Sequence, residues 1–307
     1  MARKDDRPGG VWYPRWFWPS FAAPATIWLL LFFVLPFYVV LSVAFGRLDP
    51  IFLTAEPVYN PVRWDTTPFR GVVTRLFTAG SIEQETLVRT LVYVGIATAA
   101  CLLIGYPVAY FVARHAKRTK TWLLVAFIAP FWISYMMRMF AWVNLLQEDG
   151  YVNRFLEAIG VIDHPEQWLS GRASTVVFGL IYGYIPFMIL PLFGTLDRMD
   201  RSMIEAARDL GAGQVKTFFR VTLPLSKQGI LAGCIIVALP MFGDYFTQTL
   251  LSSTRNTAMF GNLIVSSIQS SLVNTGAALV VVMVVLLIVP MLYYLRSTNV
   301  ARELAER

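Results

Sequence analysis

Six long apolar runs constrain this chain more than any other feature of its sequence. They occupy residues 21–45, 87–113, 122–146, 174–196, 229–253 and 276–296. A helix of about 20 apolar residues is long enough to cross the hydrocarbon core of a bilayer. With 56% hydrophobic and 15% charged residues, the chain of 307 residues lacks the polar surface that a soluble domain needs. We therefore predict an all-α, polytopic membrane protein with six transmembrane helices.

Most of the 26 Lys and Arg residues lie on one side of the predicted spans. They gather in the N-terminal segment 1–20, in the loop after the second span, in the loop 197–228 and in the C-terminal tail 297–307. Because loops rich in Lys and Arg stay in the cytoplasm, we expect both termini and loop 197–228 to be cytoplasmic. The run 21–45 is longer than the central region of a cleavable signal, so we expect a transmembrane domain over 21–296.

The first segment on the opposite side, 46–86, is long and contains four prolines and scattered acids. It predicts an ordered outer loop with a short amphipathic helix near its end. A mobile, solvated connector is the alternative interpretation.

Composition and residue placement exclude several functional classes. The net charge of +7 is spread over the ends of the spans rather than along a basic helix or arm, so nucleic acid is not expected as a partner. Cys101 and Cys234 lie inside predicted spans, where small buried thiols are more usual than a disulfide or a metal pair. His115 and His164 fall in opposite loops. We therefore expect neither a metal site nor histidine-based catalysis.

The longest charge-rich interval between two apolar runs is 202–224. Ser202 and Glu205 have the spacing of a capping box, and residues 203–210 are long enough for two helical turns. Gly211 is able to adopt the left-handed conformation that ends a helix. The interval therefore predicts a short helix exposed on the cytoplasmic side.

A second short helix is expected over residues 214–219, before Pro224, which cannot continue a helix without losing a hydrogen bond. The two helices would present a small apolar surface made of Ile204, Ala207, Leu210, Val215, Phe218 and Phe219. Charged residues surround this surface in the sequence, namely Arg208, Asp209, Lys216 and Arg220.

The same interval contains a recognisable pattern: Glu205-Ala206-Ala207, three residues, Gly211, nine residues and Val221-Thr222-Leu223-Pro224. It resembles the signature loop of the permease subunits of ABC importers, with Val221 where isoleucine is most frequent. The resemblance implies a type I ABC importer permease, whose coupling helices bind in a groove of the ATP-hydrolysing subunit. It assigns ATPase coupling to Glu205, Ala206, Ala207, Gly211, Leu223 and Pro224. Alternatively, Glu205 only caps its own helix and the loop is an ordinary connector.

Four further segments resemble the spermidine/putrescine importer permeases: 105–114, 130–146, 182–196, and 243–251 followed by 259–262. The likeness covers nearly all of 85–295 and is weaker in the N-terminal region. It implies a multi-pass protein of a prokaryotic cytoplasmic membrane, surrounded by lipid, that transports a small cationic solute. The implied partners are a second permease subunit, two ATPase subunits and an extracytoplasmic solute-binding protein.

A nucleotide site of the chain itself is not expected. Residues 211–217 superficially resemble a phosphate-binding loop, but that loop needs glycine directly before lysine, and Val215 precedes Lys216 here. A preceding strand is not expected either. We therefore predict no catalytic residue and no bound cofactor, with ATP and Mg²⁺ held by the partner ATPase.

Two ionisable residues inside predicted spans, Arg138 and Asp244, are candidates for function because a charge facing lipid is costly. Asp244 follows Pro240 and Gly243, which are able to open the helix. One interpretation makes Asp244 a cation-attracting point on the translocation pathway, with cation–π contacts from Tyr245, Trp132, Tyr135 or Trp142. The other makes Asp244 the structural ion-pair partner of Arg138.

Alternative functions remain open at this point. Permeases for sulfate, molybdate and ferric iron share the signature loop, so the solute could be one of these. A stand-alone secondary transporter or channel would need no ATPase at all.

Overall fold

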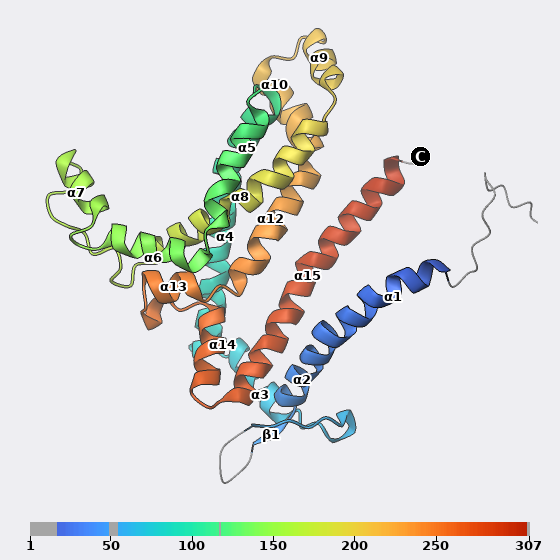
Figure 1. The fold of residues 1–307 in the computed structure, drawn as a ribbon, viewed down its shortest axis with the longest axis vertical. Coiled ribbons are helices and arrows are strands. Elements are labelled where there is room, and N and C mark those ends of the chain that lie inside the picture. The colour runs from blue at the N-terminus through green and yellow to red at the C-terminus, as the bar shows by residue number, and fades with distance from the viewer. Residues whose placement is uncertain (1–16, 49–54, 117, 306–307) are drawn as a thin grey trace, which may run out of the picture.

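The computed structural model describes residues 17–48, 55–116 and 118–305, and helices dominate these ranges (Figure 1). The elements are α1 (Phe17–Leu29), η1 (Leu30–Val34), α2 (Leu35–Ala44), β1 (Arg47–Leu48), β2 (Ala55–Glu56), η2 (Pro61–Arg63), α3 (Thr67–Phe77), α4 (Ile82–Arg114), α5 (Lys120–Ile128), η3 (Ala129–Trp132), α6 (Tyr135–Leu146), α7 (Tyr151–Ala158), α8 (Ala173–Arg198), α9 (Arg201–Asp209), α10 (Gln214–Thr217), η4 (Phe218–Thr222), α11 (Leu223–Leu225), α12 (Lys227–Phe242), α13 (Phe246–Leu251), η5 (Arg255–Thr257), α14 (Phe260–Gln269) and α15 (Val273–Ala305). The predicted all-α polytopic architecture is confirmed. Most of the predicted segment 1–20 lies outside the described residues.

Four helical segments are long and apolar enough to cross a membrane alone: Ser20–Ala44, Ile82–Arg114, Ala173–Arg198 and Val273–Arg296. Two bent pairs bring the described chain to as many as six spans. Helix α4 begins where Ser81 accepts a hydrogen bond from the Gln84 N–H at 3.2 Å, and acidic Glu83 and Glu85 follow in its first turn. Side-chain capping and early acids both stabilise a helix N-terminus.

The third predicted span is broken rather than straight. Segments Lys120–Trp132 and Tyr135–Leu146 meet at 85°, because Pro130 lies in η3 and Ile133, directly after η3, is extended. Proline removes the backbone donor that a continuous helix would use. The expected single helix over 122–146 is therefore wrong.

The fifth predicted span also ends early. Helix α12 stops at Phe242, two residues after Pro240, and the short α13 follows a break over residues 243–245. The bent pair found here joins Gln214–Leu225 to α12 at 62°. The expected helix over 229–253 is therefore replaced by α12, a break and α13.

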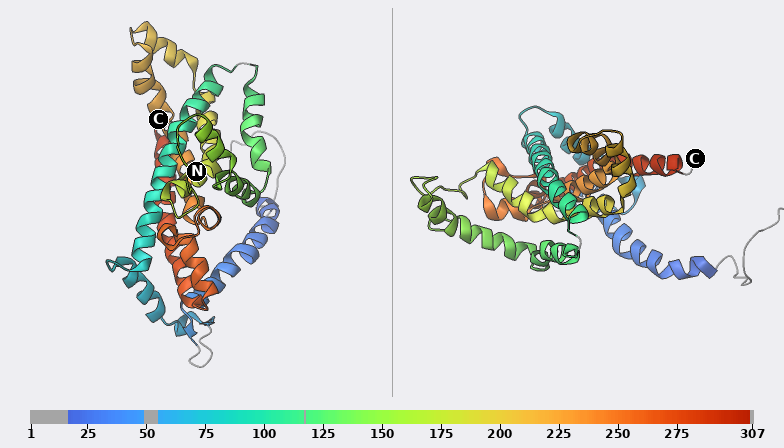
Figure 2. Two further views of the ribbon diagram at one scale, coloured as in Figure 1. Left: turned by 90° about the vertical axis from the view of Figure 1, so that its left-hand side faces the viewer. Right: turned by 90° about the horizontal axis from the view of Figure 1, so that it is seen from above.

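The buried core lies where α4, α8 and α12 pack together, as both views of Figure 2 allow the reader to follow. Gly179 and Gly183 of α8 lie where other helices approach closely. A Cβ atom at Gly179 would lie 2.4 Å from a Leu251 methyl carbon, and one at Gly183 would lie 2.6 Å from the Tyr135 ring. These two glycines therefore let α13 and Tyr135 of α6 approach α8.

The segment 46–86, predicted to be an outer loop, is ordered where it is described. Strands β1 and β2 pair antiparallel, and Phe45 stacks on Trp64 with ring centroids 4.9 Å apart. The expected short helix is α3, which buries Val72 and Leu76. The segment is thus tied to the end of α2.

The helix formed by α1, η1 and α2 stands away from the bundle at its N-terminal end (Figures 1 and 2). Its exposed side chains include Phe21, Trp28, Phe32 and Phe33, whereas Ser42 and Ala44 at the other end are buried. Near that buried end, α2 packs against α15. Only the C-terminal end of this helix therefore belongs to the core.

Candidate functional site

Helices α9 and α10 form a projecting tip at one end of the molecule (Figure 1). Helix α9 is capped by Asp200, whose carboxylate accepts the Ser202 N–H at 3.0 Å. This bond lowers the pKa of the Asp200 carboxyl group below its usual value. The expected capping box of Ser202 and Glu205 is wrong, because the cap lies two residues earlier and leaves the Glu205 side chain exposed.

Gly211 ends α9 as expected. Its φ is +80°, and the Ala212 N–H donates to the Ala207 carbonyl at 3.0 Å. A positive φ is easy for glycine and strained for branched residues. The chain therefore turns at Gly211 and starts α10 at Gln214.

The second helix of the tip is longer than expected. Residues 214–225 are helical throughout, in the order α10, η4 and α11, so the expected end at residue 219 is wrong. The turn η4 is a π-helix that ends at Thr222, two residues before Pro224. The Leu223 N–H donates to the Phe218 carbonyl, five residues earlier, and the next residue, Pro224, has no N–H to donate. Leu223 and Pro224 therefore lie inside the helix, and the bend follows at Ser226.

Among the exposed apolar side chains of the tip are Leu210, Val215 and Phe219, and we name these three the coupling face. Leu210 is 88% exposed. The charged residues Arg208, Asp209, Lys216 and Arg220 are also exposed, as is Ala206, while Ile204 and Ala207 are half-buried. The predicted apolar surface is therefore present in part.

Phe218 does not belong to the coupling face. Its ring packs edge-on against Tyr106 and Tyr110 of α4, with centroids 5.6 Å and 6.0 Å apart. The Tyr106 hydroxyl also lies 2.9 Å from the Ser226 hydroxyl, and both residues are buried. The bend between the tip and α12 is therefore fastened to α4.

A second buried polar group surrounds Asp244 in the break between α12 and α13. Its side chain belongs to a residue only 6% exposed. One carboxylate oxygen accepts hydrogen bonds from the hydroxyls of Thr247 at 2.6 Å, Tyr135 at 2.9 Å and Tyr184 at 3.2 Å. The other accepts the Thr247 N–H at 2.9 Å. Neutral donors from α6, α8 and α13 thus converge on one carboxylate.

Arg138 lies beside this group without pairing with Asp244. The residue is 8% exposed, and its guanidinium carbon is 4.0 Å from the Phe131 ring centroid. Across the described ranges, no ion pair joins Arg138 to Asp244. Buried Nε and Nη1 of Arg138 have no hydrogen-bond partner among the described residues. The ion pair considered from the sequence is therefore not formed in this conformation.

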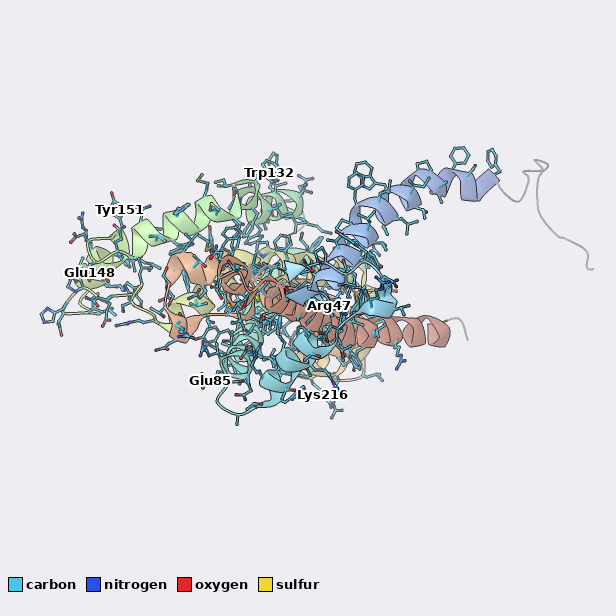
Figure 3. All side chains as sticks on the ribbon, turned by 90° about the horizontal axis from the view of Figure 1, so that it is seen from below. Arg47, Glu85, Trp132, Glu148, Tyr151 and Lys216 are labelled. Carbon is cyan, nitrogen blue, oxygen red and sulfur yellow. The ribbon has the colours of Figure 1, made fainter. Side chains whose placement is uncertain are left out.

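The other aromatic candidates are dispersed. Trp132 is 80% exposed beside the break in the third span (Figure 3). Trp142 packs edge-on against Phe178 at 4.6 Å, and Tyr245 packs against Phe246 at 5.4 Å. The structure thus brings Tyr135 to Asp244, while no described hydrogen bond joins the other three candidates to that carboxylate.

Sequence reasoning missed Tyr184 and Thr247 as partners of Asp244. Thr247 follows Asp244 by three residues, which is the spacing of a carboxylate that caps the next helix. This spacing indicates a cap only if a new helix begins near residue 246, and the sequence alone predicted one continuous helix there. Tyr184 has no such signal, because its approach depends on how α8 packs against α12.

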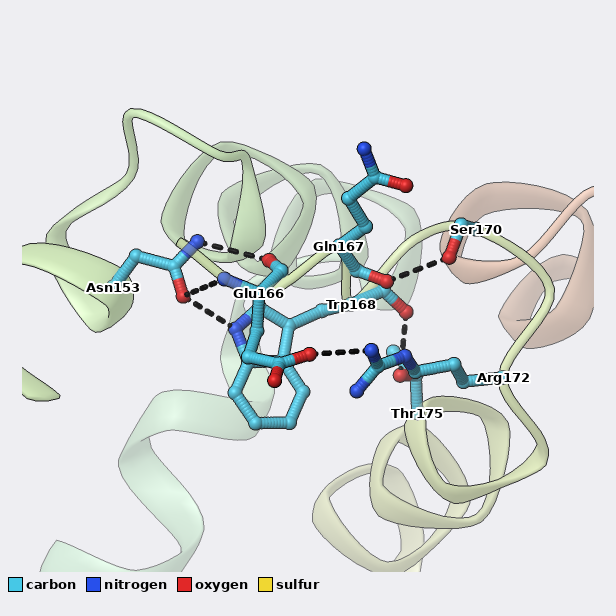
Figure 4. Close-up of polar contacts among 7 residues, drawn as sticks. All are labelled: Asn153, Glu166, Gln167, Trp168, Ser170, Arg172 and Thr175. Carbon is cyan, nitrogen blue, oxygen red and sulfur yellow. Dashed lines mark hydrogen bonds and ion pairs between the residues drawn. The ribbon is translucent and has the colours of Figure 1, made fainter. Parts of the chain in front are cut away.

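Glu148 lies between α6 and α7, and Tyr151 is the first residue of α7 (Figure 3). Asn153, which follows them in the chain, is almost fully buried and organises the loop between α6 and α8 (Figure 4). Its amide nitrogen donates to the Gln147, Glu148 and Glu166 carbonyls, and its oxygen accepts from the Trp168 indole at 2.8 Å and the Glu166 N–H at 3.2 Å. One side chain therefore joins α6, α7 and the segment before α8.

Asn153→Ala is expected to lower the stability of this loop by about 2–3 kcal/mol, because the half-buried Trp168 and Glu166 donors lose their acceptor. Faster proteolytic cleavage between residues 147 and 172 measures the change. The matched control is Asn144→Ala, since Asn144 is exposed and its amide makes one bond to the Phe140 carbonyl. Equal cleavage rates for the two variants would contradict the role given to Asn153.

A polar cavity of about 730 Å³ lies between the start of α4 and the α13–α14 region. Arg89 lines this cavity, and its guanidinium group donates to the Arg255 and Ala258 carbonyls, each at 3.1 Å. The Phe260 N–H donates to Thr90 of α4 at 2.8 Å. These bonds hold η5 and α14 against α4. Within the described ranges, no group of three His, Cys, Asp or Glu residues is arranged to hold a metal ion.

Comparisons with known proteins agree with this architecture. Residues 105–299 match the model of the family described as "binding-protein-dependent transport system inner membrane component". The spermidine/putrescine transport system permease protein PotB of Escherichia coli (strain K12) is 35% identical over 223 residues, covering 72% of this chain and 80% of that protein. The Haemophilus influenzae protein of the same name is 34% identical over 239 residues, covering 78% and 79%.

A chain of the solved bacterial alginate ABC transporter, in complex with an alginate pentasaccharide-bound periplasmic protein, has the same fold. Its TM-score is 0.70 at 18% identity, over 91% of this chain and 92% of that chain. The family match covers more than half of the sequence and contains both the coupling face and the Asp244 group. The chain therefore belongs to the inner membrane components of binding-protein-dependent transport systems.

Proposed function

We propose that this chain is the permease subunit of an ATP-driven importer whose solute is a small polyamine, spermidine or putrescine. The observation that carries the proposal is the 35% identity to a protein named for spermidine/putrescine transport, over 80% of that protein's length. A buried carboxylate surrounded by aromatic residues supports a cationic solute. The structural relatives support the fold alone, because they are only 17–18% identical.

The coupling face is proposed as the docking site for an ATP-hydrolysing subunit. Leu210, Val215 and Phe219 are apolar side chains exposed on a projecting tip, surrounded by charges. Such a patch with a polar rim is typical of a protein interface. ATP and Mg²⁺ would be bound by that subunit, and this chain would contribute no catalytic residue.

Tyr106→Phe is expected to reduce the solute transported per ATP hydrolysed about fivefold, since one buried hydrogen bond contributes about 1 kcal/mol. The change removes only the hydroxyl that fastens the bend at Ser226 to α4. The measurement is simultaneous uptake and ATP hydrolysis by the reconstituted complex. Tyr110→Phe is the control, because no described hydrogen bond involves its hydroxyl and both rings contact Phe218. If the two variants transport the same amount of solute per ATP, the Tyr106–Ser226 hydrogen bond does not transmit movement of the tip to α4.

We infer that the coupling face and both termini are cytoplasmic, since Lys and Arg concentrate on that side. The exposed apolar faces of α1 and of the α5–α6 region would meet lipid and a second permease subunit. Two such permeases, two ATPase subunits and an outer solute-binding protein would complete the importer. ATP-driven closure of the ATPase subunits would rock the permeases between outward and inward access.

The pathway is proposed to pass the Asp244 group, with Tyr135 and Arg138 beside it. Tyr245, Trp132 and Trp142 remain candidate pathway residues that would act in other conformations or at the subunit interface. Asp244 would supply the charge that attracts ammonium groups, although it receives its present hydrogen bonds from neutral donors.

Purification of the chain from its native membrane tests the assembly. An ATPase subunit and a second permease are expected to co-purify. Their absence from an intact, correctly inserted preparation would favour a stand-alone secondary transporter or channel.

A further inference from the structure

The guanidinium group of Arg138 lies against three aromatic rings, which we name the aromatic box: Phe131, Tyr135 and Tyr182. Its central carbon is 4.0 Å, 5.4 Å and 5.8 Å from the three ring centroids in that order. Phe131 and Tyr182 are also in contact with each other, with centroids 6.3 Å apart. These distances are those of cation–π interactions, which strengthen when the cation is removed from water. The box is thus occupied by a cation of the chain itself.

Arg138 is held differently from most buried charges. A buried arginine is normally paired with a carboxylate and satisfied by several hydrogen bonds. Here Nε and Nη1 are buried without a partner among the described residues, and the nearby Asp244 carboxylate takes its bonds from hydroxyls and an amide. Among the described residues, the faces of these aromatic rings are therefore the main groups that stabilise the buried positive charge of Arg138.

We propose that the aromatic box is a binding site for an alkylammonium group of the solute, and that the solute and Arg138 compete for it. The inference rests on the proposed function, since it names the site that a cationic solute would use. Exchange of one cation for another leaves the charge near Asp244 unchanged. Tyr135 belongs to both groups, because its ring faces Arg138 and its hydroxyl donates to Asp244 at 2.9 Å.

The position of the box in the fold provides a route for this exchange. Phe131 lies in η3, Tyr135 and Arg138 lie in α6, and the 85° break separates the two segments. Tyr182 is on α8. A change in the bend between η3 and α6 would move the guanidinium away from Phe131 and open the box to another cation.

The test uses the assembled importer carrying Arg138→Ala and compares the guanidinium ion with urea, which has nearly the same shape but no charge. At equal millimolar concentrations, guanidinium is expected to raise the unfolding temperature of the variant complex and urea is not. The wild-type complex should show no such rise, because Arg138 already fills the box. Adding Phe131→Leu to the variant should raise the half-saturating guanidinium concentration about tenfold. Equal effects of guanidinium and urea, or no effect of either, would overturn the proposal.

A second measurement covers the case in which Arg138→Ala does not assemble. Phe131→Leu alone, with Arg138 intact, should lower uptake of putrescine about tenfold while the solute-bound binding protein still stimulates ATP hydrolysis. Phe187→Leu is the control, because Phe187 contacts the Phe131 ring at 6.3 Å but lies outside the box. Equal uptake by the two variants would overturn the box as a solute site. Loss of the stimulated hydrolysis in the wild-type complex would instead contradict the proposed function.

Discussion

Gly211→Asp and Glu205→Ala are each expected to abolish solute uptake while the helices remain inserted in the membrane. The first places a branched, charged side chain at a φ of +80°, which costs about 1 kcal/mol or more locally and redirects the chain between α9 and α10. The second removes an exposed charge beside the coupling face. Insertion depends on the spans, not on this tip. Uptake and binding-protein-stimulated ATP hydrolysis, measured at equal membrane levels, show the effect.

Gly213→Asp is the matched control for the glycine substitution. It introduces the same charge two residues away, where φ is −62° and a Cβ atom meets no neighbour within 4 Å. A Cβ atom at Gly211 is equally unobstructed, so backbone conformation is the difference between the two sites. Wild-type uptake by Gly211→Asp or Glu205→Ala would show that the tip does not couple ATP hydrolysis to transport.

Asp244→Asn is expected to leave the complex assembled and to reduce uptake of a dication about tenfold or more, equivalent to about 1.4 kcal/mol of lost attraction. The amide keeps the volume of the carboxylate, and the surrounding hydroxyls of Tyr135, Tyr184 and Thr247 are able to reorient as acceptors. Asp149→Asn serves as a control at an exposed acid of the outer loop. Normal polyamine uptake by the assembled Asp244→Asn importer would exclude the pathway role.

A double variant separates the pathway role from a structural one. If Asp244 neutralises Arg138 in another conformation, Asp244→Asn alone would strand a buried cation at a cost of about 3–5 kcal/mol and lower expression. Adding Arg138→Gln would then restore expression. Under the pathway role, the double variant assembles but still fails to take up polyamine.

The fold could be predicted from the sequence wherever a single helix satisfies its own backbone. The runs that became α4 and α8 are continuous, and their apolar length alone predicts them. The runs 122–146 and 229–253 are also apolar but are broken at residues 133–134 and 243–245. Hydropathy does not distinguish a straight span from a bent one, because a proline is tolerated wherever neighbouring helices satisfy the freed groups.

The two candidate sites differ in how far local sequence determines them. The left-handed turn at Gly211 and the exposed Leu210 follow from residues close together in the chain. The partners of Asp244 come from α6, α8 and α13, and their meeting depends on Gly183 leaving room for Tyr135. No pattern of neighbouring residues in the sequence predicts that Tyr135 packs against Gly183 and reaches Asp244. The capping residue of α9 was missed for a simpler reason, since Asp200 and Ser202 are both good caps and the helix uses the first.

Transport by the purified complex in proteoliposomes tests the central claim most directly. The complex is oriented with its ATPase subunits facing the vesicle interior, which contains ATP, and the binding protein is added outside. Spermidine or putrescine is then expected to stimulate ATP hydrolysis and to accumulate inside the vesicles against its gradient. Sulfate, molybdate and ferric iron, each with its own binding protein, should do neither. Polyamine accumulation without ATP, or ATP hydrolysis stimulated by one of the other three solutes instead, would contradict the claim that this chain is the permease of an ATP-driven polyamine importer.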